Sequence, residues 1–297
     1  MAKYLNPKAD LTFKKVFGEH KNLVISLLNS LLPLPEGMRI ESVEYLSGEN
    51  HHGTSDKKYS IVDVKCVDNY GRTFVVEMQN YWTTAFFSRT LYNAVLTYSN
   101  QLKKGQSFDK LKDVYALSLV NESEIECSVE NADDYIHEYY LTNQKNSKDV
   151  HKDISLIFVE LQKYKTLGKP FVNKAVGKIA DLWMKFLTEI DDDTVEVDPE
   201  LLSSPETAEA LEILETSGYT PEELEAYNKY WLDISTERSA LAEHEAKGCA
   251  EGLAQGLTQG AKHKSIETAK KMKADNSPLE MIVKYTGLSA EEIAEIE

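Results

Sequence analysis

Two short apolar segments joined by a turn, between Lys57 and Trp82, constrain most strongly how this chain can fold. On either side of the turn, residues 68–71, the side chains alternate with the period of two that is typical of β-strands. A glycine-containing loop between two such segments is typical of a β-hairpin. The sequence therefore predicts a hairpin with one apolar face turned toward a core and a second face lining a cleft.

The register of this hairpin decides where its acidic residues lie. If the loop is 69–71, Asp63 lies directly opposite Glu77, and Gln79 follows on the same face. Directly opposed side chains are about 4.5–5.5 Å apart at Cβ, where like charges are destabilising. A divalent cation would offset this repulsion, because Mg²⁺ is held by one or two carboxylates with water and phosphate oxygens. The alternative is a solvated polar face, with Asp63 in water or paired with Lys65, because a shift of one residue in register would separate the pair.

Several segments, taken together, are similar to one family. They are an Asp on one strand followed by VEMQ on the next, ADLTFKKVFG near the start, RTLYNAVLTYSNQLKKG, FVELQKY and the repeated Gly near the C-terminus. In their order and spacing they resemble the Rpn-type PD-(D/E)XK nuclease family transposases of bacteria. The resemblance covers almost the whole chain.

This resemblance implies an α/β fold: a restriction-endonuclease-like core, with a mixed sheet flanked by helices, and an α-helical C-terminal region. It implies a DNA endonuclease that uses Mg²⁺, or Mn²⁺, to hydrolyse phosphodiester bonds during recombination or in mobile elements. Asp63 and Glu77 would hold the metal, and Gln79 would position the attacking water. Because Gln79 stands where most members carry Lys, the alternative is a catalytically weakened nuclease-fold protein that binds DNA or protein.

The segment 7–18 predicts a first helix with Phe13 among its apolar residues. Asp10 can be interpreted as the N-cap of this helix. The family's N-terminal motif instead implies that Asp10 adds an acidic group near the metal. Lys14 could reach a phosphate, or could lie in solvent.

The segment 84–104 predicts a helix that ends at Gly105. Arg89 and Gln101 lie near its apolar stripe and are candidates for phosphate or base contacts. Hydrogen bonds that tie the helix to the sheet are the alternative for both. The residues expected to form the apolar stripe are Phe87, Leu91, Ala94, Val95, Tyr98 and Leu102.

Charge is unevenly distributed over the chain, whose net charge is −16. Residues 1–170 carry 21 Lys and Arg against 22 Asp and Glu, whereas residues 171–297 carry 12 against 27. The overall charge argues against a nucleic-acid partner, but phosphate binding depends on local Lys and Arg. The nearly neutral N-terminal part is therefore compatible with DNA.

Composition also suggests the domain organisation. We expect a nuclease-like core over 1–190, an acidic linker rich in Ser and Pro over 191–220, and a helical region over 221–297. In the helical region, four Gly recur at intervals of four, at positions 248, 252, 256 and 260. Each Gly costs a helix about 1 kcal/mol relative to Ala. This favours a helix that packs closely, in a homo-oligomer or against its own chain; a flexible stalk is the alternative.

The end of the chain, 277–297, is similar in shape to a helix-turn-helix, with Ser289 and Glu292 as a capping box. Its second helix is acidic, so a protein contact is favoured over DNA reading. The three Cys have no paired spacing, which argues against disulfides and a zinc site. The sequence has no apolar run long enough to span a membrane and begins without the apolar segment of a signal peptide. We therefore expect a cytoplasmic protein without a membrane partner.

Overall fold

The computed structural model describes residues 3–35, 37–47, 49–50, 60–61, 63–122, 133–167 and 177–296. The start of the expected hairpin segment and Cys127 lie outside these residues. The chain divides into two compact units, Met1–Tyr230 and Trp231–Glu297. No helix of the described residues is long and apolar enough to cross a bilayer.

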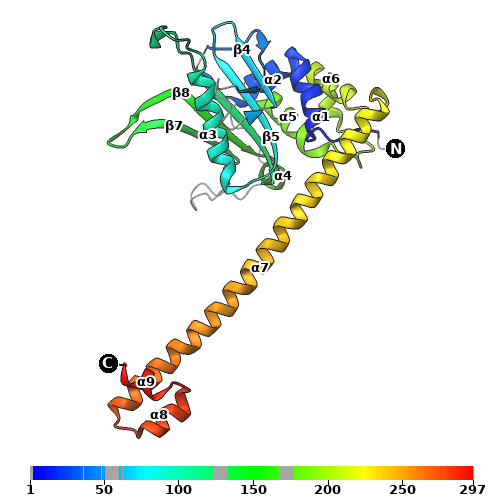
Figure 1. Ribbon diagram of the computed structural model, residues 1–297. Helices are drawn as coiled ribbons and strands as arrows, with labels where there is room; N and C mark the ends of the chain where they lie inside the picture. Colours follow the sequence, from blue (N-terminus) through cyan, green and yellow to red (C-terminus); the bar gives the residue numbers. More distant parts are fainter. Residues whose placement is uncertain are drawn as a thin grey trace. The chain divides into compact units, whose positions relative to one another are not determined.

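A six-stranded mixed sheet lies at the centre of the first unit (Figure 1). Its strands, in spatial order, are β1 (Val43–Tyr45), β4 (Val64–Asp68), β5 (Thr73–Tyr81), β6 (Val114–Glu122), β8 (Asn146–Glu160) and β7 (Ile136–Asn143). The β5–β6 and β6–β8 pairs are parallel, and the other pairs are antiparallel. Two further strands, β2 (Glu49–Asn50) and β3 (Ser60–Ile61), pair with each other. The expected α/β class is confirmed.

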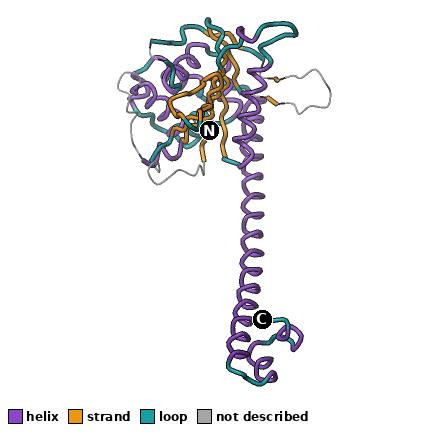
Figure 2. The backbone as a smooth tube through the Cα atoms, turned by 90° about the vertical axis from the view of Figure 1, so that its left-hand side faces the viewer, coloured by secondary structure: helices purple, strands orange, loops and turns teal. Residues whose placement is uncertain are grey.

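Helices cover both faces of this sheet, as the tube in Figure 2 also shows. The helix α3 (Thr84–Ser99) lies on one face, and α2 (Lys21–Leu31), α5 (Gly177–Glu189) and α6 (Pro205–Ile213) lie on the other (Figure 1). The first unit also contains α1 (Asp10–Phe13), which continues into a π-helical turn over Lys14–Gly18, and α4 (Leu161–Leu167). Short 3₁₀ turns span Phe108–Lys110, Pro199–Ser203 and Thr216–Gly218.

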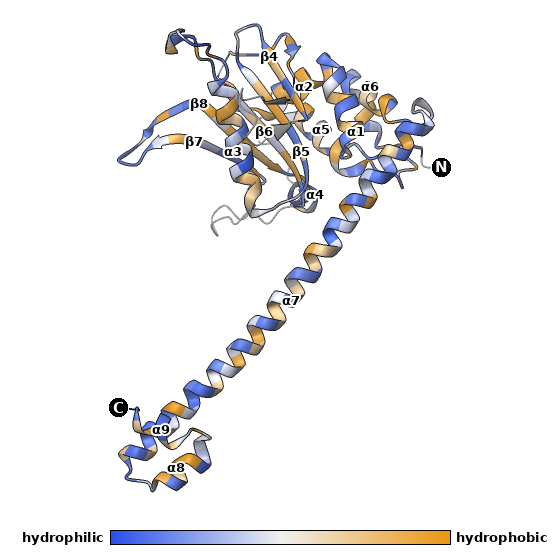
Figure 3. Cartoon of the chain, in the orientation of Figure 1, coloured by the Kyte–Doolittle hydropathy of each residue, from blue (hydrophilic) through white to orange (hydrophobic). Residues whose placement is uncertain are grey.

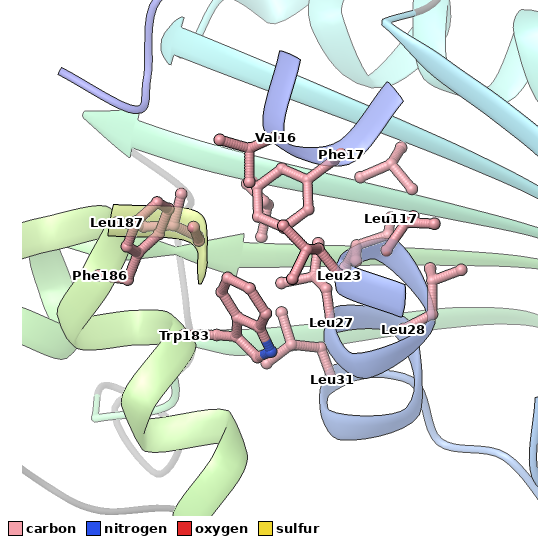
Figure 4. Packing of buried hydrophobic residues seen from close by; sticks show 14 of the residues in the cluster. Val16, Phe17, Leu23, Leu27, Leu28, Leu31, Leu117, Trp183, Phe186 and Leu187 are labelled. Carbon is pink, nitrogen blue, oxygen red and sulfur yellow. The ribbon is translucent and has the colours of Figure 1, made fainter. Parts of the chain in front are cut away.

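Alternation along β5 sends its side chains into two separate cores. Phe74 and Val76 join the large core beneath α2, α5 and α6, whereas Val75 joins the smaller core beneath α3. In the large core, Phe17 packs edge-on against Trp183 at a centroid distance of 5.3 Å (Figure 4). The central strand β6 is buried on both faces, as its nearly continuous apolar sequence indicates. The face that carries Asp63 was expected to line a cleft; instead α3 covers Val75 and Glu77 on that face.

The orientation of α3 differs from the expected one. Leu91 and Val95, expected on the buried stripe, are 41% and 44% exposed. Thr90, Asn93 and Thr97 are buried in their place, beside Phe86 and Ala94. The helix thus turns a mixed polar and apolar face toward the sheet.

Asp10 does not cap α1. The N-cap is Ala9, without a side-chain hydrogen bond, and Asp10 is the first helical residue. There its carboxylate forms an ion pair with Lys14, one turn later, at 2.6 Å. Phe13, the apolar residue named for this helix, is fully buried.

The expected linker over 191–220 is also not a linker. Leu201, Leu211 and Leu214 from this segment are buried in the large core. The Asp, Ser and Pro that suggested a boundary instead form caps and turns, such as the Asp198 side chain that accepts from the Glu200 N–H at 2.9 Å. The first unit accordingly extends to Tyr230.

The second unit contains most of α7 (Pro221–Ala274) together with α8 (Leu279–Thr286) and α9 (Ala290–Ala294). A small core joins the end of α7 to α8 and α9 through Ala269, Ile282, Leu288 and Ile293. The capping box of Ser289 and Glu292 is confirmed. Hydrophilic residues recur along much of α7, in contrast to the strands of the first unit (Figure 3).

Candidate active site

The turn between β4 and β5 is fixed by Asp68. Its Oδ1 accepts the backbone N–H groups of Tyr70 at 3.0 Å and Arg72 at 2.9 Å. Its Oδ2 pairs with the Arg72 guanidinium at 2.6 and 2.7 Å. Gly71 has φ of 82°, in the left-handed region where a side chain would be strained. These contacts hold the loop at residues 69–71 and so set the register of the strands.

Asp63 lies close to Glu77 at the start of β4. β4 and β5 pair Val64 with Val76 and Val67 with Thr73. Asp63 immediately precedes β4, outside the paired residues. The negative charge of Asp63 raises the pKa of Glu77, so the two carboxylates lie within electrostatic reach of each other.

Asp63 is half-buried and is held by the backbone of the opposite strand. Its Oδ2 accepts the N–H of Met78 at 2.7 Å. Burial, aided by the negative charge of Asp10, raises the pKa of Asp63 to about 6, although the Met78 N–H, Lys14 and Arg89 each lower this pKa. The carboxylate is therefore near its titration range just below neutral pH.

Glu77 lies deeper, with 7% of its surface exposed. Its Oε1 accepts the side-chain amide N–H of Asn93, on α3, at 2.9 Å. Burial raises the pKa of Glu77, and the nearby charge of Asp63 adds to this effect. The charge of Asp63 thus acts on Glu77 beneath α3.

Gln79 continues this face and connects to α3 as well. Its Oε1 accepts from Arg89 Nη2 at 2.6 Å, and its Nε2 donates to the Tyr81 carbonyl at 2.8 Å. A primary amide has two N–H groups and two carbonyl lone pairs, so these bonds do not exhaust its capacity. The structure therefore brings together Asp63, Glu77, Gln79 and Arg89.

Asn93 is the member of this group that the sequence did not predict. It lies four residues after Arg89, so both side chains are on adjacent turns of one helix face. The signal was the spacing of Arg89, Asn93 and Thr97, a polar series that ordinary amphipathic reasoning assigns to solvent.

Asp10 and Lys14 lie within electrostatic reach of this group, because both affect the pKa of Asp63. They are also bound to each other. Within the part of the chain that the structure describes, no three His, Cys, Asp or Glu residues are grouped so that they could hold a metal ion. A site here would consist of the pair Asp63 and Glu77, with its remaining ligands from water or substrate.

Gln101 is not part of this group. It follows the C-terminal end of α3, where its Nε2 donates to the Lys112 carbonyl at 2.9 Å and its Oε1 accepts the Lys112 N–H at 2.8 Å. These two bonds tie the end of the helix to the segment before β6, as the alternative interpretation stated.

The model of the PD-(D/E)XK nuclease family transposases matches residues 7–241. The chain belongs to this family. The match includes the whole sheet, the hairpin with Asp63 and Glu77, and the first part of α7. Searches of curated proteins and of solved structures find no match.

Proposed function

We propose that the protein is a metal-dependent DNA endonuclease that hydrolyses phosphodiester bonds in recombination or mobile-element movement. The observation that supports this best is the electrostatically coupled pair Asp63 and Glu77, whose carboxylates accept the Met78 N–H and the Asn93 amide N–H. Two neighbouring acidic groups that both have raised pKa values favour a functional role over a solvated surface. Membership of a nuclease family agrees with this choice.

The donor set fits Mg²⁺ or Mn²⁺. Asp63 and Glu77 offer carboxylate oxygens, the ligands that hard divalent cations prefer, and Asp10 is close enough to add charge. A cation bound there supplies a Lewis acid for the phosphate and lowers the pKa of a coordinated water.

The chain's own groups supply orientation and further charge. The Met78 N–H and the Asn93 amide each hold one oxygen of Asp63 and Glu77, respectively, which leaves the other carboxylate oxygens for a cation. Gln79 positions the attacking water by hydrogen bonding. Lys14 and Arg89 contact DNA phosphates. We do not extend this proposal to Gln101, since its amide is bound to the Lys112 backbone.

Plasmid nicking tests the proposal. Supercoiled DNA is incubated with Mg²⁺ or Mn²⁺ and the wild-type protein, Asp63→Ala, or Asp109→Ala, whose aspartate is exposed in the short 3₁₀ turn before β6. Wild type and Asp109→Ala should nick, and Asp63→Ala should lose at least about 100-fold in rate, as expected when a transition-state charge is no longer stabilised. Equal nicking by all three would point to a contaminant and overturn the assignment of Asp63.

The alternative function is a nuclease-fold protein that binds DNA or protein without efficient cleavage. It is favoured by Gln79, which cannot carry the positive charge of the Lys found in most members. DNA binding by wild type without metal-dependent nicking would select this alternative.

We also propose that α7 mediates homo-oligomerisation. Gly248, Gly252, Gly256 and Gly260 lie along one slowly drifting helix face, and no atom lies within 4 Å of a Cβ built on any of them. Leu253 and Leu257 beside them are 65% and 67% exposed. A second copy packed against this face would offset the cost of the glycines, about 1 kcal/mol each.

Molar mass from light scattering tests this second proposal. Gly252→Leu and Gly256→Leu should lower the oligomeric state, because side chains would fill the line of close approach. Ala254→Leu, on the opposite side of α7, is the matched control and should leave it unchanged. A wild-type monomer at all concentrations, or an unchanged oligomer after truncation near residue 245, would contradict the role of α7.

A further inference from the structure

Cleavage of a phosphodiester builds negative charge on the phosphate oxygens, and fixed positive groups stabilise that charge. The strand residue that follows Glu77 by two positions, Gln79, is neutral. If the protein is the proposed nuclease, a residue other than Gln79 supplies this positive charge.

Arg89 is held beside Gln79 by two contacts. Its Nη2 donates to Gln79 Oε1 at 2.6 Å, and its guanidinium lies 5.0 Å from the ring centroid of the buried Phe86. The bond from Gln79 Nε2 to the Tyr81 carbonyl orients the amide so that its oxygen faces Arg89. These contacts hold the side chain of Arg89 in a defined position although Arg89 is exposed.

This position follows from matching repeats on α3 and β5. Four residues of a helix rise about 6 Å, and two residues of a strand extend about 6.6–6.8 Å. Asn93 and Arg89, four apart on α3, therefore meet Glu77 and Gln79, two apart on β5. The helix that supports the buried carboxylate also delivers the guanidinium.

The charge of Arg89 reaches both acidic groups. It lowers the pKa of Asp63 and of Glu77, opposing the effect of burial. Lys14 also acts on Asp63, but its ammonium is paired with Asp10. A guanidinium has five N–H donors in a planar fork that matches phosphate oxygens, and the bond to Gln79 uses one of them.

We propose that Arg89 on α3 supplies to the scissile phosphate the positive charge that β5 lacks at Gln79, and that Gln79 is a positioning residue for Arg89. The guanidinium binds a non-bridging phosphate oxygen while the water oxygen forms a bond to phosphorus and the P–O bond to the leaving deoxyribose oxygen breaks. The attacking water loses a proton to solvent, and the leaving oxygen takes one up.

Three variants separate charge from hydrogen bonding. Arg89→Lys keeps a positive charge, Arg89→Gln keeps a hydrogen-bond donor to Gln79 without charge, and Arg89→Gln with Gln79→Lys moves the charge to the strand. We expect Arg89→Gln to lose about 100-fold in nicking rate and Arg89→Lys to stay within about 10-fold of wild type. The double variant should recover at least about 10-fold of the loss.

A second readout does not need cleavage. In an Asp63→Ala background with EDTA, DNA affinity is measured against salt concentration, and Arg89→Gln should reduce the salt slope by about 1, as expected for one lost phosphate contact. Arg89→Lys should retain the slope. The inference is overturned if Arg89→Gln nicks as fast as wild type, or if the double variant recovers nothing. If wild type does not nick at all, the nuclease proposal fails, and an unchanged salt slope in Arg89→Gln then overturns the phosphate contact separately.

Discussion

At the residue scale, the ionisation of Asp63 couples activity to pH. Its pKa is raised to about 6 by burial, so the carboxylate is mostly protonated below that pH. A cation binds the ionised form, because protons compete for the same oxygens. We expect metal-dependent nicking at subsaturating Mg²⁺ to fall as pH is lowered through about 6, and a tenfold rise in Mg²⁺ to shift the midpoint to lower pH. A rate that is flat down to pH 5 would contradict this role for Asp63.

The same group should reduce stability at neutral pH. A carboxyl group has a pKa near 3.9 in an unfolded chain, so the folded state binds its proton more tightly. Between about pH 4 and 6 the stability contributed by Asp63 therefore falls as pH rises. Asp63→Asn should raise the free energy of unfolding at pH 7.5 by about 1–2 kcal/mol in urea titrations, because it keeps an oxygen for Met78 N–H without the charge. Asp109→Asn is the control and should change it by less than about 0.5 kcal/mol.

Part of this residue group could be predicted from the sequence, for a physical reason. The period of two in a strand is rigid, so a glycine-containing turn and an alternating pattern suffice to predict the pairing of β4 with β5, which leaves Asp63 at the start of β4 near Glu77. Asn93 was missed because a helical residue's partner depends on how the helix is rotated against the sheet. That rotation is a property of tertiary packing.

At the element scale, the positions of apolar residues in α3 do not predict which face of this helix is buried. The stripe containing Leu91 and Val95 predicts one buried face, but the structure buries Thr90, Asn93 and Thr97 instead. A buried carboxylate such as Glu77 requires a hydrogen-bond donor. The bonds from Asn93 to Glu77 and from Arg89 to Gln79 therefore fix the rotation of α3 at the expense of exposing two apolar side chains.

Substitutions on α3 test this rotation. Leu91→Gln and Val95→Gln should each change the free energy of unfolding by less than about 0.5 kcal/mol, because both side chains are already exposed. Phe86→Ala should cost about 3–5 kcal/mol, since Phe86 is buried and packs edge-on against Trp82 and Phe158. Urea denaturation measures all three. A loss of more than about 2 kcal/mol in the free energy of unfolding for Leu91→Gln would show that Leu91 is buried, as the apolar stripe predicted.

At the scale of the whole molecule, the boundary of the first unit depends on a few buried Leu side chains, which the polar composition of their segment does not reveal. The segment 191–220 is rich in Asp, Ser and Pro, yet its Leu residues complete the large core. The start of α7 is bound to the same unit by two contacts. Glu223 forms an ion pair with Lys15 at 2.7 Å, and the Tyr227 hydroxyl donates to Asp192 at 2.7 Å. The family match, which ends at residue 241, includes these contacts.

Two fragments test where the nuclease core ends. Fragment 1–241 keeps the buried Leu201, Leu211 and Leu214 and the first turns of α7, so it should unfold cooperatively and nick DNA at a rate within about threefold of the full chain. Fragment 1–190 exposes the apolar surface that these side chains cover; because each buried Leu stabilises by about 1.5–3 kcal/mol and a domain's whole stability is about 5–15 kcal/mol, it should fail to fold. Circular dichroism during thermal unfolding and plasmid nicking measure the two outcomes. A folded and active fragment 1–190 would show that residues 191–220 are a linker after all. A folded but inactive fragment 1–241 would show that catalysis depends on the second unit.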